Sequence, residues 1–168
     1  MIFETHAHYD DEAFNGDRDE LLCSMKENGI ETIVNVGASF RGVEDTVKLM
    51  EQYSFVYGAV GIHPDEVGDL DEEKMEILCR YCHLPKTVAV GEIGLDYYWN
   101  KENHDTQKKW FVRQMDLAKE TDLPIIVHSR DAAKDTLELM KAERADCLRG
   151  AIHCYSYSRE HAREYMNM

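Results

Sequence analysis

One segment near the middle of the chain indicates the fold: Thr87-Val88-Ala89-Val90-Gly91-Glu92-Ile93-Gly94-Leu95-Asp96. It combines a run of apolar residues that favour β-strands with two carboxylates. Thr87–Ile93 has the composition of a strand buried on both faces, as strands of parallel sheets are. Amphipathic stretches of helical length flank it, at Asp71–Cys82 and at Asp105–Thr121. A helix, a buried strand and a second helix in this order are typical of βα units.

The same alternation continues outward to both ends of the chain. The other candidate strands are Ile2–His6, Glu31–Val36, Val56–Ile62, Pro124–His128 and Gly150–Cys154. The other candidate helices are Asp17–Asn28, Arg41–Tyr53, Ala132–Arg144 and Ser158–Met166. In the helix at Asp105–Thr121 a stripe predicts a core-facing side, formed by Trp110, Phe111, Gln114, Met115 and Ala118. The sequence therefore predicts an α/β fold of about six βα units around a parallel sheet.

The charge of the chain limits its function. Its 168 residues contain 19 Lys and Arg against 33 Asp and Glu, for a net charge of −14, and suffice for one domain. This balance argues against a broad basic face for nucleic acid, but it leaves room for a small site where bound cations supply positive charge. No apolar run reaches the length of a membrane span, and the N-terminus has no export pattern. With an odd number of cysteines, we expect a cytoplasmic protein and no membrane partner.

Candidate metal ligands lie at or just after the ends of the expected strands: His6, His8, His63, Glu92, His128 and His153. Alternate residues of a strand face the same way, so His6 and His8 can point inward together. Glu92, His128 and His153 are separated by roughly one βα unit of about 30 residues, so these side chains should meet at one end of the sheet. Imidazole and carboxylate suit Zn²⁺ and related divalent ions, and a carboxylate can bridge two of them.

Two features have alternative interpretations. His63, in Gly61-Ile62-His63-Pro64, is either a substrate-binding residue or a rim histidine with a structural role. Tyr97-Tyr98-Trp99 follows the central strand, and its rings could stack on bases or close the rim of the sheet. Taken alone, the aromatic run favours closing the rim.

Five motifs together resemble one known family. They are Thr5-His6-Ala7-His8, Val60-Gly61-Ile62-His63-Pro64, Gly91-Glu92-Ile93-Gly94-Leu95-Asp96-Tyr97-Tyr98, Pro124-Ile125-Ile126-Val127-His128-Ser129-Arg130-Asp131-Ala132 and His153-Cys154-Tyr155-Ser156. In this order they resemble the TatD family of metal-dependent deoxyribonucleases, which are amidohydrolase-like TIM barrels. The resemblance extends over the whole chain.

The resemblance implies a two-metal site and a DNA substrate. His6 and His8 would hold one divalent ion, Glu92 would bridge as the catalytic carboxylate, and His128 with His153 would hold the second ion. The ions would be Zn, Mg or Mn. Arg130 would pair with a substrate phosphate, with a local salt bridge to Asp131 as the alternative. The implied reaction is phosphodiester hydrolysis in DNA, with metals about 4 Å apart.

The chain departs from the family pattern at three places. Glu4 replaces the usual aspartate, and Tyr157 replaces a glycine after Ser156, which should narrow or reshape that loop. A later Glu-Thr-Asp segment, whose aspartate serves the family as acid/base, has no match after His153.

The resemblance also sets an expectation about the extent of the fold. A complete TIM barrel needs about 250 residues. We therefore expect residues 1–168 to form a single TatD-like hydrolase domain, an incomplete TIM-type barrel that lacks strands seven and eight. Its open sheet edges could take a complementing chain or a second copy.

Two other functions remain open from the sequence. An amidohydrolase-type esterase or amidase could use the same metals, because metals polarise carbonyl and phosphoryl oxygens alike. The missing aspartate also allows a non-catalytic or partner-requiring fragment that binds metal without turnover.

Overall fold

The strands of the protein form one parallel sheet. The computed structural model describes residues 1–168. The sheet has the order β1-β2-β3-β4-β5-β6, so every strand pairs with its neighbours in sequence. Its strands are β1 (Ile2–Ala7), β2 (Ile30–Val36), β3 (Val56–Val60), β4 (Thr87–Asp96), β5 (Ile125–Arg130) and β6 (Gly150–Ile152). The predicted α/β fold with six parallel strands is confirmed.

Helices follow the strands in the predicted alternation. They are α1 (Arg18–Ser24), α2 (Phe40–Gln52), α3 (Glu72–Cys82), α4 (His104–Thr121), α5 (Ala133–Ala142) and α6 (Arg159–Met166). Three short 3₁₀ helices that the sequence did not predict are η1 (Glu12–Phe14), η2 (Pro64–Asp69) and η3 (Ala145–Cys147). None of the helices is long and apolar enough to span a bilayer.

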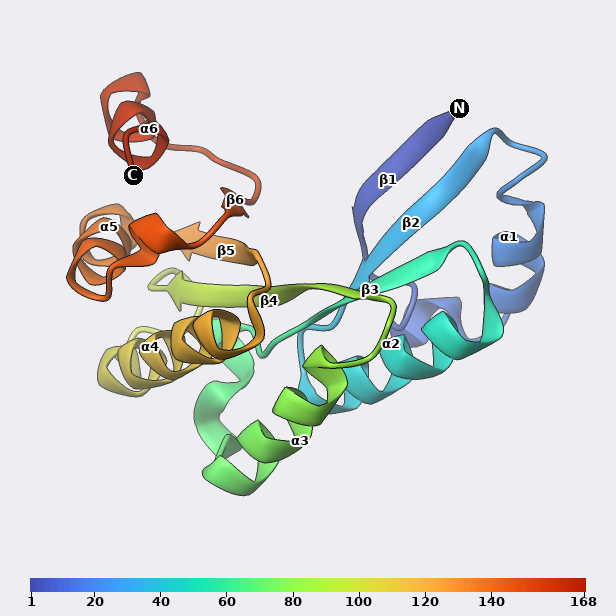
Figure 1. Cartoon of the computed structure of the whole chain (residues 1–168), viewed down its shortest axis with the longest axis horizontal. Coiled ribbons are helices and arrows are strands. Elements are labelled where there is room, and N and C mark those ends of the chain that lie inside the picture. The colour runs from blue at the N-terminus through green and yellow to red at the C-terminus, as the bar shows by residue number, and fades with distance from the viewer.

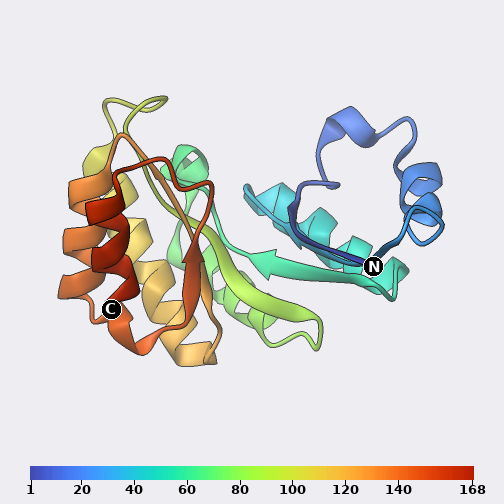
Figure 2. The ribbon, with the colours of Figure 1, turned by 90° about the horizontal axis from the view of Figure 1, so that it is seen from above.

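The helices cover one side of a curved sheet. In Figure 1, α2, α3 and α4 lie along its lower, outer side, and no helix or strand joins β1 to β6 across the top. Figure 2 places the N- and C-termini on opposite sides of the molecule. The edge strand β1 leaves Ile2 and Phe3 52% and 60% exposed. Pairing of these edges with another chain stays a prediction.

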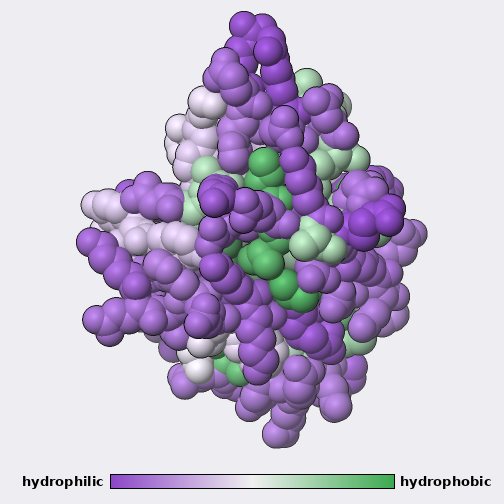
Figure 3. Space-filling view, turned by 90° about the vertical axis from the view of Figure 1, so that its left-hand side faces the viewer, coloured by the Kyte–Doolittle hydropathy of each residue, from purple (hydrophilic) through white to green (hydrophobic).

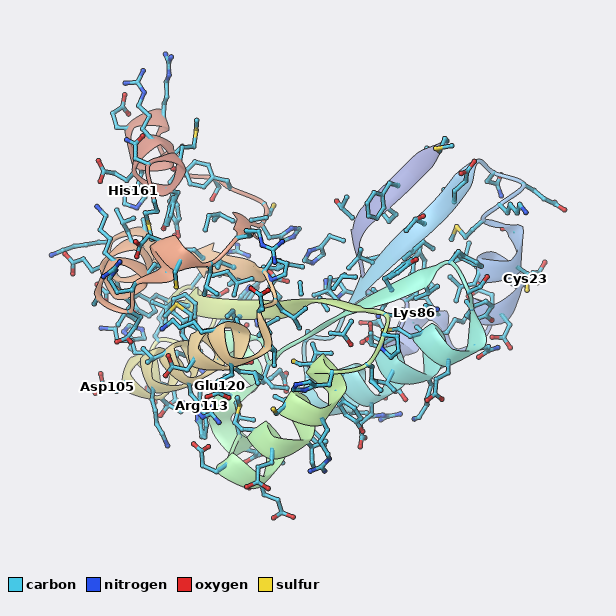
Figure 4. All side chains as sticks on the ribbon, in the orientation of Figure 1. Cys23, Lys86, Asp105, Arg113, Glu120 and His161 are labelled. Atoms are coloured by element: carbon cyan, nitrogen blue, oxygen red, sulfur yellow. The ribbon has the colours of Figure 1, made fainter.

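The core lies mainly between β4 and the helix α4. A cluster of 21 buried residues includes Trp110, Phe111, Met115 and Ala118, as the helical stripe predicted. The face in Figure 3 is mostly hydrophilic, with a hydrophobic area near its centre and smaller ones toward its edges. The side chains of Figure 4 include Lys86 at the start of β4, where its ammonium donates to the carbonyl oxygens of Met50 and Tyr53. Lys86 thus joins the end of α2 to the sheet.

Two glutamines of α4 complete the backbone hydrogen bonding of the strand ends. Gln114 accepts from the Ile62 amide at 2.7 Å and donates to the Ile62 carbonyl at 3.1 Å. Gln107 makes the same pair of bonds with Asp96, both at 2.9 Å. Both glutamines are buried, so α4 replaces the pairing that these residues would otherwise lack.

The strand β4 extends three residues beyond the predicted end at Ile93. Gly94 pairs with His128, and Asp96 pairs with Arg130. Gly94 has a φ of +145°, and a side chain there would overlap the His128 carbonyl oxygen. The glycine therefore permits the close approach that continues the strand, and local composition could not show this.

Other predicted boundaries need correction. The strand β6 ends at Ile152 rather than Cys154, because Cys154 has a φ of +45° and cannot continue an extended strand. The strand β3 ends at Val60, and the chain then turns into η2 through His63, its N-cap residue. The helix α1 ends at Ser24 instead of Asn28, and Gly29 beyond it has a φ of +80°.

Candidate metal centre

The candidate ligands lie around one cavity at the carboxyl ends of the strands. His8, His63, Glu92, His128 and His153 line this cavity of about 710 Å³. His6 is joined to it through an Nε2–Oε2 contact of 3.3 Å with Glu92. The sequence expectation that these side chains meet at one end of the sheet therefore agrees with the geometry.

Glu92 occupies the centre of the group. Its carboxylate is buried, with a side chain 5% exposed, and Oε1 lies 3.1 Å from His128 Nδ1 while Oε2 faces His6. Burial by itself raises the pKa of Glu92, but the hydrogen bonds from His128 and His6 outweigh it, so this pKa is held far below its ordinary value. Glu92 is therefore an anion with one oxygen toward each histidine.

His8 is oriented for a ligand role. Its Nδ1 lies 2.7 Å from the Val36 carbonyl oxygen, which can only accept, so Nδ1 carries the hydrogen. The lone pair of Nε2 then points toward His6, whose Nε2 is 3.2 Å away. His6, His8 and Glu92 each bring one ligand atom within 4.8 Å of the others, which fits one divalent cation.

His128 lies between two carboxylates. Its Nδ1 faces Glu92, and its Nε2 is 2.9 Å from Oδ2 of Asp96. Burial lowers the pKa of His128, but the two carboxylates outweigh burial and raise it above the ordinary value. Asp96 is a candidate functional residue that the sequence reasoning did not assign, although the central motif contains it. The available signal was its acidic side chain at the end of a strand next to that of His128.

His63 stands beside His128 rather than apart from the ligand group. Its ring packs edge-on against the His128 ring, with centroids 4.2 Å apart, and its Nδ1 accepts from the Asp65 amide at 3.2 Å. Burial, together with the nearby His128, lowers the pKa of His63 to about 4. His63, Glu92 and His128 form a second group of possible ligands within 4.8 Å. While Nδ1 accepts from the Asp65 amide, the neutral His63 ring carries its hydrogen on Nε2, so Nε2 is a hydrogen-bond donor.

His153 lies just beyond β6, the edge strand at the other end of the sheet from β1, and lines the cavity. Its ring stacks on His6, with centroids 3.6 Å apart and an interplanar angle of 11°. It belongs to neither ligand group around Glu92. Its assignment to the second metal stays a prediction.

Arg130 is exposed at the end of β5. It forms no ion pair with Asp131, and its guanidinium lies 4.0 Å from the centre of the Tyr98 ring. Tyr157, at the place of the expected glycine, brings its hydroxyl within 3.0 Å of Ser129 Oγ and accepts from the Ala132 amide. Tyr157 thereby joins the loop after β6 to the end of β5.

A known protein family matches the sequence of this chain over nearly its full length. The family model for TatD related DNase matches residues 3–168. The chain belongs to the TatD related DNase family. The predicted family membership is confirmed.

Three relatives show the extent of the match with the TatD family. YabD of Bacillus subtilis (strain 168), an uncharacterized metal-dependent hydrolase, is 40% identical over 168 residues, which are 100% of this chain and 66% of YabD. The 3'-5' ssDNA/RNA exonuclease TatD of Shigella flexneri serotype 5b (strain 8401) is 29% identical over 160 residues, with 95% of this chain and 61% of that protein covered. The crystal structure of YJJV, a TatD homolog from Escherichia coli K12, matches with a TM-score of 0.89 at 28% identity, covering 99% of this chain and 64% of that chain.

These matches support the TatD-type α/β fold over the whole chain. The chain spans slightly less than two thirds of the length of these relatives.

Proposed function

We propose that residues 1–168 form a TatD-type hydrolase domain that cleaves phosphodiester bonds in DNA at a site for two divalent cations. Zn, Mg and Mn are the candidate ions. His6 and His8 would hold the first ion, Glu92 would serve both ions, and His128 with His153 would hold the second. The names of the relatives, which include metal-dependent hydrolases and a nuclease, support this proposal.

One observation carries the proposal. The two oxygens of Glu92 face ring nitrogens of His6 and His128 at 3.3 and 3.1 Å, from opposite sides of one buried carboxylate. A carboxylate between two sets of nitrogen ligands is the arrangement that bridges two cations.

The charge of the cavity also favours bound cations. Its wall includes the acidic residues Asp10, Asp11, Glu12, Asp45, Asp65 and Glu66. Its one basic residue, Arg41, is paired with Glu12 at 2.9 Å. A phosphodiester would be repelled from this wall unless cations offset the charge.

The residues of the chain have separate roles in this proposal. Bound divalent cations supply an activated water and stabilise the leaving oxygen. Glu92 and the histidines hold the site together, while Arg130 contacts a phosphate oxygen. His63, whose pKa of about 4 keeps it neutral at pH 7, accepts from the Asp65 amide at Nδ1, so its Nε2 carries the hydrogen and can donate to a substrate oxygen.

Metal content and turnover test the proposal together. We expect two metal ions per purified chain by mass spectrometry of metals, and fewer in His128→Ala and Glu92→Gln. The matched control is His83→Ala, because His83 is exposed at the end of α3 and bonds only to the Cys79 carbonyl. Unchanged metal content in His128→Ala would show that the second site is assigned wrongly.

Substrate comparison separates the alternatives. We expect hydrolysis of a DNA oligonucleotide and none of p-nitrophenyl acetate. Faster cleavage of the small ester would favour an esterase of the amidohydrolase type. Metal binding without any turnover would favour the non-catalytic or partner-requiring fragment.

A further inference from the structure

Two exposed aromatic rings lie beside the candidate metal centre. Tyr98 and Trp99 are 45% and 67% exposed, and their ring centroids are 4.7 Å apart at an angle of 88°. Their neighbour Tyr97 has a different role, because its hydroxyl bonds to Asp135 at 2.8 Å and its ring stacks on His104. Tyr97 therefore closes the rim, whereas Tyr98 and Trp99 remain largely exposed.

The turn that carries the two rings is fixed in place. The amides of Tyr98 and Trp99 both donate to Oδ1 of the fully buried Asp96, at 2.8 Å each. Oδ2 of the same carboxylate faces His128. Because Asp96 contacts both this turn and His128, the backbone that carries the two rings is held at a fixed position relative to the metal centre.

Arg130 completes this surface with a free positive charge. Its guanidinium lies 4.0 Å from the Tyr98 ring centre and 5.4 Å from that of Trp99, and it forms no ion pair. The guanidinium thus lies close to both rings, which meet edge to face. Arranging the rings before binding reduces the entropy that a ligand must overcome.

The surface is continuous with the metal cavity. Trp99, Asn100 and Asp65 line a depression of about 460 Å³, and Asp65 also lines the central cavity. A chain-like ligand with a phosphate at the metal centre can therefore extend along Asp65 to Trp99. Planar rings beside an unpaired guanidinium match a base and its phosphate.

We propose that Tyr98, Trp99 and Arg130 form a subsite that stacks on an unpaired base of a single-stranded nucleic acid. This inference rests on the proposed function, since it places the neighbouring phosphodiester at the metal centre. A base within a duplex has both faces covered, so the subsite selects single strands. Trp99 presents the more exposed ring and is the main stacking partner.

Strand binding tests the subsite without turnover. The probes are a labelled phosphorothioate oligothymidylate of twelve nucleotides and an abasic phosphorothioate strand of equal length, which resist cleavage, titrated at low salt with Mn²⁺ present and followed by fluorescence anisotropy. We expect the abasic strand to bind about tenfold more weakly, as loss of stacking on one base predicts. Oligothymidylate should also quench tryptophan fluorescence through Trp99, because the other tryptophan, Trp110, is buried in the core.

Variants distinguish stacking from a structural role. Trp99→Ala should weaken oligothymidylate binding about tenfold and bring the two strands to equal affinity, while Trp99→Phe should keep the preference. Arg130→Gln should weaken both strands and reduce the salt dependence by about one phosphate contact. The control is Phe3→Ala, which truncates an aromatic ring 60% exposed on β1 and should leave the preference unchanged.

The outcomes separate this inference from the proposed function. Equal affinity of the native protein for the two strands, or no measurable binding of either, overturns the stacking subsite even if DNA is hydrolysed. Preference for the strand with bases, lost in Trp99→Ala and kept in Trp99→Phe, supports it even if nothing is hydrolysed.

Discussion

Asp96 Oδ2 lies 2.9 Å from Nε2 of His128, and Asp96 is fully buried. Ionised carboxylates only accept hydrogen bonds, so in the metal-free chain both ring nitrogens carry a hydrogen, Nε2 toward Asp96 and Nδ1 toward Glu92. Nδ1 faces the metal centre and is the nitrogen that would exchange its hydrogen for a cation. Asp96 thus determines which nitrogen of His128 faces Glu92 and the metal centre.

Asp96→Asn should reduce metal affinity by about 10- to 100-fold without unfolding the chain. The asparagine oxygen can still accept from the amides of Tyr98 and Trp99, but its NH₂ group then faces His128. His128 must accept at Nε2, which places the hydrogen on Nδ1 and blocks the ligand atom. Isothermal titration with Zn²⁺ or Mn²⁺ measures the loss.

Asp135→Asn is the matched control for Asp96→Asn. Asp135 accepts from the Tyr97 hydroxyl and pairs with Lys108, away from the candidate ligands. Its metal affinity should equal that of the native chain. Equal affinity in Asp96→Asn as well would contradict the orienting role.

The stability of the metal-free chain should fall as the pH is lowered from about 6.5 to about 4 through His63. Its pKa is about 4 in the folded chain against 6.5 in the unfolded chain, so the unfolded chain binds the extra proton in this window. Stability is fully present above 6.5, and the loss reaches roughly 3 kcal/mol once the pH is below the folded value. Urea unfolding in EDTA at several pH values measures it.

His63→Asn isolates this effect from the titration of the other groups. Asparagine can accept the Asp65 amide as an N-cap but does not titrate in this range. The stability of the native chain relative to His63→Asn should rise from pH 4 to pH 7 by the same roughly 3 kcal/mol. Parallel curves for the two chains would contradict the lowered pKa.

Gln114→Leu should destabilise the chain by about 2–5 kcal/mol, because the buried amide and carbonyl of Ile62 both lose their partner. The side chain keeps a similar volume, so lost packing is a minor part of the effect. Gln52→Leu, at an exposed position of α2, is the control and should change stability by less than about 0.5 kcal/mol. Similar losses for both variants would contradict the role of Gln114 as the hydrogen-bonding partner of Ile62.

Gly94→Ala should destabilise the chain by about 3 kcal/mol or more, since the new side chain meets the His128 carbonyl and the φ of +145° disfavours it. Gly68→Ala is the counterpart, because nothing lies within 4 Å of a side chain added there. Thermal unfolding of both variants measures the contrast. A small effect at Gly94 would mean that β4 and β5 can separate without cost.

The sequence predicted the order of strands and helices because hydrophobic periodicity is local. The core side of α4 followed from the spacing of Trp110, Phe111 and Met115 for the same reason. The extension of β4 to Asp96 depends on its pairing with β5 through Gly94, and the early end of β6 depends on the backbone of Cys154. Neither is visible in local composition.

The sequence predicted which residues form the candidate site, but it predicted less well which of their side chains contact one another. His6, His8, Glu92 and His128 follow from strand ends that meet. The place of His63 next to His128, and the stacking of His153 on His6, depend on loop geometry after the strands. The orienting role of Asp96 and the position of Arg130 over Tyr98 required the register of β4 and β5.

The strictly sequential strand order has a consequence for assembly. Each strand can dock on the one made just before it, yet Glu92 on β4 needs both His6 from the first strand and His128 from the fifth. Ions that bind these three side chains would bind only chains in which strands β1 to β5 have paired. Divalent ions should therefore stabilise the fully paired sheet and slow its unfolding.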